Sequence, residues 1–124
     1  MTFDNVFAVV PVTDFDAARV WFERLGGRPA DRNPMDGLAE WQVTEGGAMQ
    51  LLRDAGRSGA AMVTVGVEDV DRHVAVLAER GLDVGAVEDT PGGVRIPALT
   101  DPAGNVITLA QDVDRTSELP ASCG

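Results

Sequence analysis

Few side chains in this chain are suited to catalysis, and they are widely separated. All ten basic residues are arginines, there is no tyrosine, and His73 and Cys123 are the only histidine and cysteine. A Schiff base or a Walker-type phosphate loop needs a lysine, and a hydroxyl or thiol nucleophile needs a histidine base nearby. The serines lie in a glycine-rich stretch and in the polar C-terminal region. We therefore expect no catalytic nucleophile and no disulfide framework.

The remaining titratable groups fit structural roles better than catalytic ones. His73 lies in a predicted helix with no second histidine or cysteine to share a metal or a proton, so we interpret it as a surface residue. The pairs Asp14/Asp16 and Asp69/Asp71 could act in acid–base chemistry, but each stands where a helix is predicted to begin. Carboxylates at that place cap the helix and complement its dipole, and this is the interpretation we adopt.

The charge of the chain narrows the range of partners. The net charge is -10 and the isoelectric point is about 4.3, so nucleic acid and anionic membranes, which attract basic patches, are disfavoured. A cationic small molecule is compatible with this charge. No apolar run approaches the ~20 residues that span a bilayer, and no basic segment precedes the first run. Together with the single cysteine, these features favour a cytoplasmic protein.

The chain is made of two similar halves. In the first, a valine-rich strand over Val6–Val12 leads into a helix over Asp14–Leu25, which a pair of glycines ends. In the second, a strand over Ala61–Val67 leads into a helix that runs to Arg80 and also stops at a glycine. Residues of the first half match residues of the second half at one constant distance along the sequence, which indicates an internal repeat.

Three short strand-like runs follow each helix: Arg28–Arg32, Leu38–Thr44 and Ala48–Arg53, then Val84–Glu88, Gly93–Leu99 and Val106–Gln111. The sequence therefore predicts an α+β fold of two tandem βαβββ modules. We expect one domain over 1–111, with a first module over about 3–53, a polar linker over 54–59 and a second module over about 60–111. Residues 112–124 have no periodicity and are expected to form a flexible polar tail.

Strand alternation assigns the side chains to two faces. Phe7, Gln50, Met62 and Thr108 share the face that turns away from the helices, where Phe7 is followed by Val9 and Pro11. On a curved sheet with helices on its convex side, these residues would lie in the concavity. Trp41 lies on one of the predicted strands and is either a core residue or a stacking wall for a planar ligand.

The sequence resembles the vicinal oxygen chelate superfamily, which includes glyoxalases, bleomycin resistance proteins and extradiol dioxygenases. The resemblance covers roughly residues 3–111. Its marks are Pro11-Val12-Thr13-Asp14, Trp21-Phe22-Glu23-Arg24-Leu25-Gly26, Val67-Glu68-Asp69-Val70-Asp71, and Gly93-Val94-Arg95 running to Asp101-Pro102-Ala103-Gly104-Asn105. It implies two modules whose mixed sheets curl around an open cleft, with the helices outside and commonly with two chains sharing each cleft.

The resemblance also implies where a metal would bind. The metalloenzymes of this superfamily place His, Gln or Glu ligands at positions that correspond here to Phe7, Gln50, Met62 and Thr108. Phenylalanine cannot ligate, methionine is too soft for hard or borderline divalent ions and threonine is weak, so only Gln50 is a plausible ligand. A catalytic divalent site usually has three protein ligands. We therefore expect no metal and no cofactor, as in a metal-free branch similar to the bleomycin resistance proteins.

The expected function is metal-independent binding, or sequestration, of a small molecule or antibiotic, with no catalytic residue. The expected cleft is lined by Phe7, Trp41, Gln50, Met62, Thr108 and Arg95. Arg95 matches a frequent arginine of the family and either reaches into the cleft or forms a structural ion pair. The alternatives are a glyoxalase-like lyase or isomerase with an atypical active site, and an accessory domain whose cleft binds nothing tightly. We also expect a homodimer.

Overall fold

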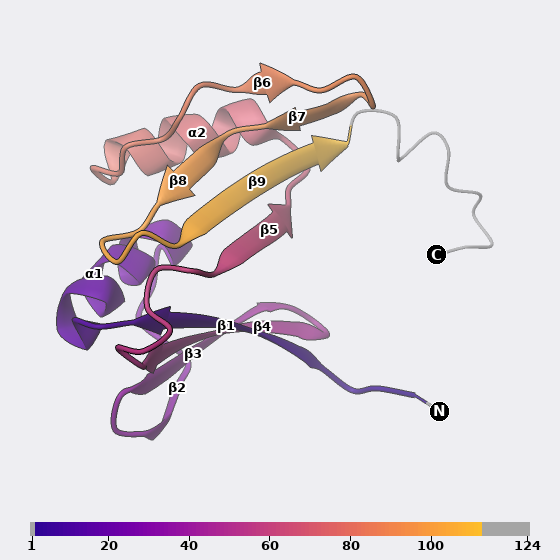
Figure 1. The fold of residues 1–124 in the computed structure, drawn as a ribbon. Helices are drawn as coiled ribbons and strands as arrows, with labels where there is room; N and C mark the ends of the chain where they lie inside the picture. Colours follow the sequence, from indigo (N-terminus) through magenta and orange to yellow (C-terminus); the bar gives the residue numbers. More distant parts are fainter. Residues whose placement is uncertain (1, 113–124) are drawn as a thin grey trace. The chain divides into compact units, whose positions relative to one another are not determined.

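The computed structural model describes residues 2–112, which form two compact units (Figure 1). The N-terminal unit contains the chain up to Val63 together with Thr100–Val106. The C-terminal unit contains Thr64–Leu99 and, of the described residues, 107–112. Cys123 and all but the first residue of the expected tail lie outside the described residues. Neither helix in the described part of the chain is long and apolar enough to cross a membrane.

The N-terminal unit has the expected βαβββ order. Its elements are β1 (Val6–Val12), α1 (Phe15–Gly26), β2 (Arg32–Met35), β3 (Leu38–Thr44) and β4 (Gly47–Arg53). The strand order is β1-β4-β3-β2, with β1 parallel to β4 and the other pairs antiparallel. The α+β fold class predicted from the sequence is confirmed.

The helix α1 begins and packs as its sequence predicts. The side chain of Asp14 accepts a hydrogen bond from the Ala17 backbone N–H at 3.1 Å, which satisfies a donor that has no partner within the helix. The apolar side of α1, with Phe22 among its buried residues, covers one face of the sheet. On that face Val10 and Leu51 are fully buried, so the core of this unit lies between α1 and the sheet.

One strand of this unit lies later than predicted. The sequence indicated a strand over Arg28–Arg32, whereas β2 begins only at Arg32. The Asp31 carboxylate accepts hydrogen bonds from Arg28 Nη2 at 2.9 Å and from the Gln42 backbone N–H at 2.7 Å. These side-chain contacts, together with one backbone hydrogen bond from the Asp31 N–H to the Glu40 carbonyl at 2.8 Å, hold the start of this segment against β3.

The second half contains a helix and five strands. They are β5 (Met62–Gly66), α2 (Val70–Glu79), β6 (Glu88–Asp89), β7 (Val94–Ile96), β8 (Ala98–Thr100) and β9 (Val106–Asp112). The sheet order is β5-β9-β7-β6, and β8 also pairs with β9. The single strand predicted over Gly93–Leu99 is interrupted at Pro97, which has no N–H to donate to a ladder. The strand predicted over Val84–Glu88 is reduced to the two residues of β6.

The turn before β9 belongs to the N-terminal unit because of one buried side chain. Asn105 is fully buried. Its Oδ1 accepts the Ala61 backbone N–H at 2.9 Å, and its Nδ2 donates to the Pro11 carbonyl and to Asp101 Oδ2, both at 2.8 Å. The end of β1, the start of β5 and the 101–105 turn therefore meet at one residue.

The predicted linker over 54–59 is also tied to this point. The Asp54 backbone N–H donates to the Val12 carbonyl at 2.9 Å, and the Gly59 N–H donates to the Pro11 carbonyl at 3.4 Å. Gly59 has φ +86°, and a Cβ there would lie 2.5 Å from the carbonyl oxygen of Ala103. Only glycine fits this position without a shift of the backbone.

Asn105→Ala tests this arrangement. The change leaves the Ala61 N–H and the Pro11 carbonyl without their buried partner, and we expect it to lower the free energy of unfolding by about 2–4 kcal/mol. Urea unfolding followed by circular dichroism measures this loss as a lower midpoint with an unchanged slope. Asn33→Ala, in the exposed strand β2, is the control and should change stability by less than about 0.5 kcal/mol. Equal effects of the two changes would contradict the central role of Asn105.

Candidate functional site

The face of the N-terminal sheet that turns away from α1 carries two of the predicted site residues. We call it the open face. Val10 and Leu51 point toward α1, so alternation turns Val9 and Gln50, which are paired in the β1–β4 ladder, to the open face. Phe7 lies two residues before Val9 on the same side. Phe7 and Val9 are 45% and 42% exposed, so this face presents apolar side chains to solvent.

A buried carboxylate lies on the same face. Glu40 of β3 is paired with Gln50 of β4, and its side chain is only 6% exposed. Its Oε2 accepts a hydrogen bond from Gln50 Nε2 at 3.1 Å, while its Oε1 lies 3.7 Å from Nη1 of Arg32, an arginine whose side chain is 68% exposed. Glu40 was not among the predicted site residues. Alternation places Glu40 on the face opposite Trp41, and only the pairing of β3 with β4 shows that this is the face of Gln50.

Trp41 lies in the core and not on the open face. It is 4% exposed and is paired with Met49, on the side of the sheet that α1 covers. Its ring centroid lies 6.1 Å from that of Phe22, and its Nε1 donates to the Arg28 carbonyl at 3.1 Å. The stacking-wall interpretation is therefore corrected: the indole is buried and its one donor is already used.

Thr108 lines a pocket that lies entirely in the C-terminal unit. The pocket has a volume of about 230 Å³, and its lining residues are Gly85, Ala86, Glu88, Ile96, Pro97, Ala98 and Thr108. It is mostly apolar, with the Thr108 hydroxyl and the Glu88 carboxylate as its side-chain polar groups. Met62, at the start of β5, is 84% exposed and is not part of this lining.

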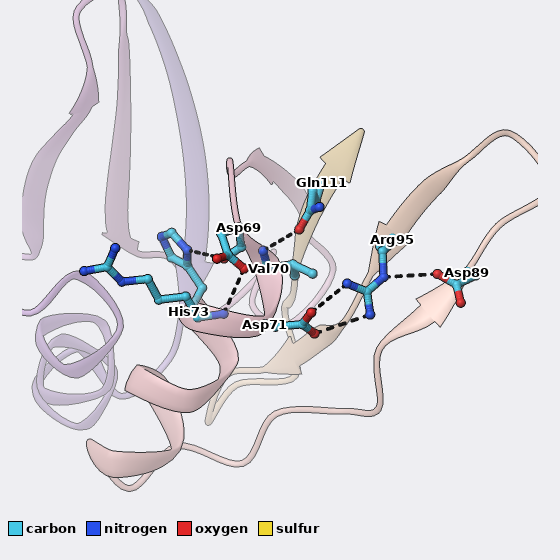
Figure 2. A network of polar contacts seen from close by, with 8 residues as sticks. Asp69, Val70, Asp71, His73, Asp89, Arg95 and Gln111 are labelled. Atoms are coloured by element: carbon cyan, nitrogen blue, oxygen red, sulfur yellow. Dashed lines mark hydrogen bonds and ion pairs between the residues drawn. The ribbon is translucent and has the colours of Figure 1, made fainter. Parts of the chain in front are cut away.

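Arg95 forms the structural ion pair that the sequence left as one of two possibilities (Figure 2). Its Nη1 and Nη2 donate to the two carboxylate oxygens of Asp71 at 2.8 and 3.3 Å, and its Nε donates to Asp89 at 3.1 Å. The hydrogen bond from Arg95 lowers the pKa of Asp71, and the same bond raises the pKa of Arg95. The guanidinium thus links α2 to β6 and β7.

Backbone N–H groups at the N-terminus of α2 donate hydrogen bonds to acceptors of the chain itself, as Figure 2 shows. The Asp69 side chain accepts the Arg72 N–H at 3.2 Å, and Gln111 Oε1 accepts the Val70 N–H at 2.7 Å. His73 Nδ1 lies 3.0 Å from the Asp69 carbonyl oxygen, at an exposed position. The capping interpretation of Asp69 and the surface interpretation of His73 are confirmed.

The residues at the positions of the expected metal ligands do not fit a divalent ion. Phe7 has no donor atom, Met62 offers only a thioether and Thr108 a weakly binding hydroxyl, so the amide oxygen of Gln50 is the one acceptable ligand atom among these four positions. Within residues 2–112, no group of three His, Cys, Asp or Glu side chains is placed to hold a metal. The donor set is therefore short of the three ligands that a catalytic divalent site requires.

Comparison with known proteins gives clear structural relatives. A glyoxalase/bleomycin resistance protein from Catenulispora acidiphila DSM 44928 is 34% identical, with 86% of this chain and 96% of that chain covered and a TM-score of 0.81. An antibiotic binding protein from Streptomyces sp. CB03234 is 26% identical, with coverages of 90% and 98% and a TM-score of 0.74.

A bleomycin-binding protein, solved in complex with bleomycin, is 20% identical, with coverages of 88% and 98% and a TM-score of 0.73. At this identity the likeness supports the fold alone. No family model matches the chain, and no curated protein matches it.

The ion pair of Arg95 makes a prediction about acid stability. Because the pKa of Asp71 is lowered from 3.8, its carboxylate stabilises the fold above that pH, and this contribution is lost as the pH falls through the lowered pKa. We expect Asp71→Asn to have a slightly lower melting temperature than the wild type at neutral pH, with the two curves converging in acid. Asp16→Asn removes the same charge from the first turn of α1 without touching Arg95. Identical pH curves for the two variants would contradict the ion-pair explanation.

Proposed function

This chain belongs to the glyoxalase/bleomycin resistance protein family, and we propose that it binds a small molecule of the antibiotic type and does not transform it. The observation that carries the proposal is the open face, where the exposed apolar side chains of Phe7 and Val9 lie next to the polar pair of Gln50 and Glu40. Such a surface can cover an apolar ring and orient it with a few hydrogen bonds. Binding of antibiotics by relatives of the same fold supports this proposal.

The titratable groups favour binding over catalysis. Two carboxylates are buried among the described residues, Glu40 and Asp101. Both oxygens of Asp101 accept hydrogen bonds within the 101–105 turn, so its role is structural. Glu40 remains as a single candidate base. A lyase or isomerase that moves a proton next to a carbonyl also needs a group that stabilises the developing oxyanion.

We propose that binding is independent of a metal. The support is the chemistry of the side chains at the four positions of the expected ligands, because only Gln50 offers an acceptable ligand atom there and a catalytic divalent site usually has three protein ligands. The chain would act in the cytoplasm, where its single cysteine stays reduced. The net charge of -10 suits a cationic ligand.

We further propose a homodimer, because one edge of each sheet is protected and the other is not. The edge strand β2 contains Pro34, and the edge strand β6 has only two residues, both acidic. Proline, charge and short length all discourage strand pairing. The edge strand β5 has no proline, and β1 has its one proline, Pro11, near its end, so the first part of each strand is unprotected. These strands begin with Val6 and Met62, which are 68% and 84% exposed. Pairing with a second copy would cover such edges.

A thermal-shift measurement tests ligand binding. Bleomycin and a panel of apolar, ring-containing antibiotics are added to the full chain. A bound compound at about 100 times its Kd should raise the melting temperature by roughly 5–10 °C, because it binds the folded state alone. We expect EDTA to leave this shift unchanged and Phe7→Asp to abolish it.

Val20→Asp is the matched control for that experiment. Val20 is 43% exposed on α1, close to the 45% of Phe7, so the same change of charge is made outside the open face. This variant should keep the shift. A panel with no binder would contradict the proposed function, and conversion of a panel compound, seen as a new mass, would favour the lyase or isomerase.

Light scattering tests the dimer. We expect a mass of about twice the 13.0 kDa of the chain at micromolar concentration. Val6→Lys places a charge on the free edge of β1 and should shift the protein toward the monomer, whereas Arg32→Lys on the protected edge should not. A mass of 13.0 kDa for the wild-type chain throughout the micromolar range would refute the homodimer.

A further inference from the structure

Glu40 is a nearly buried charge with few partners. A carboxylate has two oxygens and about four positions at which it can accept hydrogen bonds. The Glu40 side chain is 6% exposed, yet it accepts one hydrogen bond, from Gln50, and has one ion-pair contact, with Arg32. Buried charges are normally surrounded by hydrogen-bond donors, because leaving water costs several kcal/mol per ion.

The Oε1 atom of Glu40 is the part of this carboxylate that remains available. Its contact with Arg32 Nη1 is 3.7 Å long, which is beyond hydrogen-bond distance. Within residues 2–112, every buried side-chain nitrogen or oxygen has a hydrogen-bond partner. Oε1 has none, so it is not one of these completely buried atoms. The open face therefore presents one carboxylate oxygen whose acceptor positions are unused.

The surroundings of Oε1 define the chemistry of the group that would bind it. Val9, Gln50, Glu40 and Arg32 occupy one row across the sheet, from β1 through β4 and β3 to β2, according to the strand register. An apolar surface thus lies on one side of the carboxylate and a cation on the other. The Gln50 side chain donates to Oε2 and holds the carboxylate in place, with Oε1 left for a donor.

We propose that Glu40 recognises a cationic hydrogen-bond donor of the ligand, such as a protonated amine or an amidinium, attached to an apolar ring that lies against Val9 and Phe7. This rests on the proposed function and adds the class of ligand. Charge-assisted hydrogen bonds are about twice as strong as neutral ones, so the carboxylate discriminates between cationic and neutral ligands of one shape.

Arg32 occupies this position in the free protein. Its guanidinium is on the exposed edge strand β2, its side chain is 68% exposed, and its distance from Oε1 is long for an ion pair. Such a contact contributes little to stability. A ligand cation can therefore displace Arg32 from Oε1, and Arg32 acts as a weak internal competitor for the site.

Benzamidine and benzamide are a matched pair of probes, since both have a phenyl ring and a planar head group but only benzamidine is a cation. Each is titrated into the ¹⁵N-labelled full chain and followed by two-dimensional NMR. We expect benzamidine to shift the backbone amide of Val9 and the side-chain amide of Gln50, with an affinity about tenfold higher than that of benzamide.

Three variants separate recognition by Glu40 from general attraction to an acidic protein. Glu40→Gln keeps the shape and should reduce the benzamidine affinity to that of benzamide, while Arg32→Gln should keep or increase it. Glu23→Gln, which removes a partly exposed carboxylate of α1, changes the net charge equally and should have no effect. The melting temperature of each variant shows that it is folded.

The inference is overturned if benzamidine and benzamide bind equally, if neither shifts Val9 and Gln50, if Glu40→Gln binds like the wild type, or if Arg32→Gln loses binding. The thermal-shift measurement with the antibiotic panel tests the proposed function independently. If a compound of that panel binds while benzamidine shows no preference, the small-molecule function stands and the role of Glu40 fails. If neither assay shows binding, both fail.

Discussion

The N-terminal unit depends on the hydrogen bonds of one buried amide. Asn105 uses both its oxygen and its nitrogen, and it joins Pro11 to Ala61, two residues far apart in the sequence. Asp101 supports it by accepting hydrogen bonds from the Asn105 side chain and from its backbone N–H. Without Asn105 the Ala61 N–H would lose this partner and the Pro11 carbonyl would keep only the 3.4 Å hydrogen bond from the Gly59 N–H, and an unpaired polar group in the interior costs about 1–3 kcal/mol. Asn105 thus holds the end of β1 against the start of β5 and the 101–105 turn, while the ladder with β4 positions β1 within the sheet and forms the open face.

The sequence predicted best the elements that are both apolar and bounded by strong signals. The bounds of β1 and β3 agree with the prediction, because a valine-rich or alternating run lies between turn residues, and both helices begin at the capping aspartates expected for them. The edge strands β2 and β6 were displaced, because all of their residues are exposed and no apolar pattern marks them. Side chains from distant segments decide where such strands begin.

The alternation of side chains along single strands was enough to predict part of the candidate site. The pattern along β1 and β4 places Phe7 and Gln50 on one face without knowledge of the partner strands. For Trp41 alternation left two faces open, and only the pairing of Trp41 with Met49 resolves the choice. The role of Glu40 depends on Gln50 in the neighbouring strand, and the role of Arg95 depends on Asp71 in α2. No local sequence pattern encodes these contacts.

The stability of the sheet does not explain a carboxylate at position 40. A buried charge with one hydrogen bond and a long ion pair stabilises a fold less than an apolar side chain of similar size, because the cost of leaving water is only partly offset. A leucine in its place would extend the apolar surface that Phe7 and Val9 present on the open face. Glu40 instead keeps an acceptor fixed by Gln50 within that surface. A fixed acceptor in apolar surroundings is the arrangement that recognises a ligand donor, and the stability forgone at this position is the physical cost of that recognition.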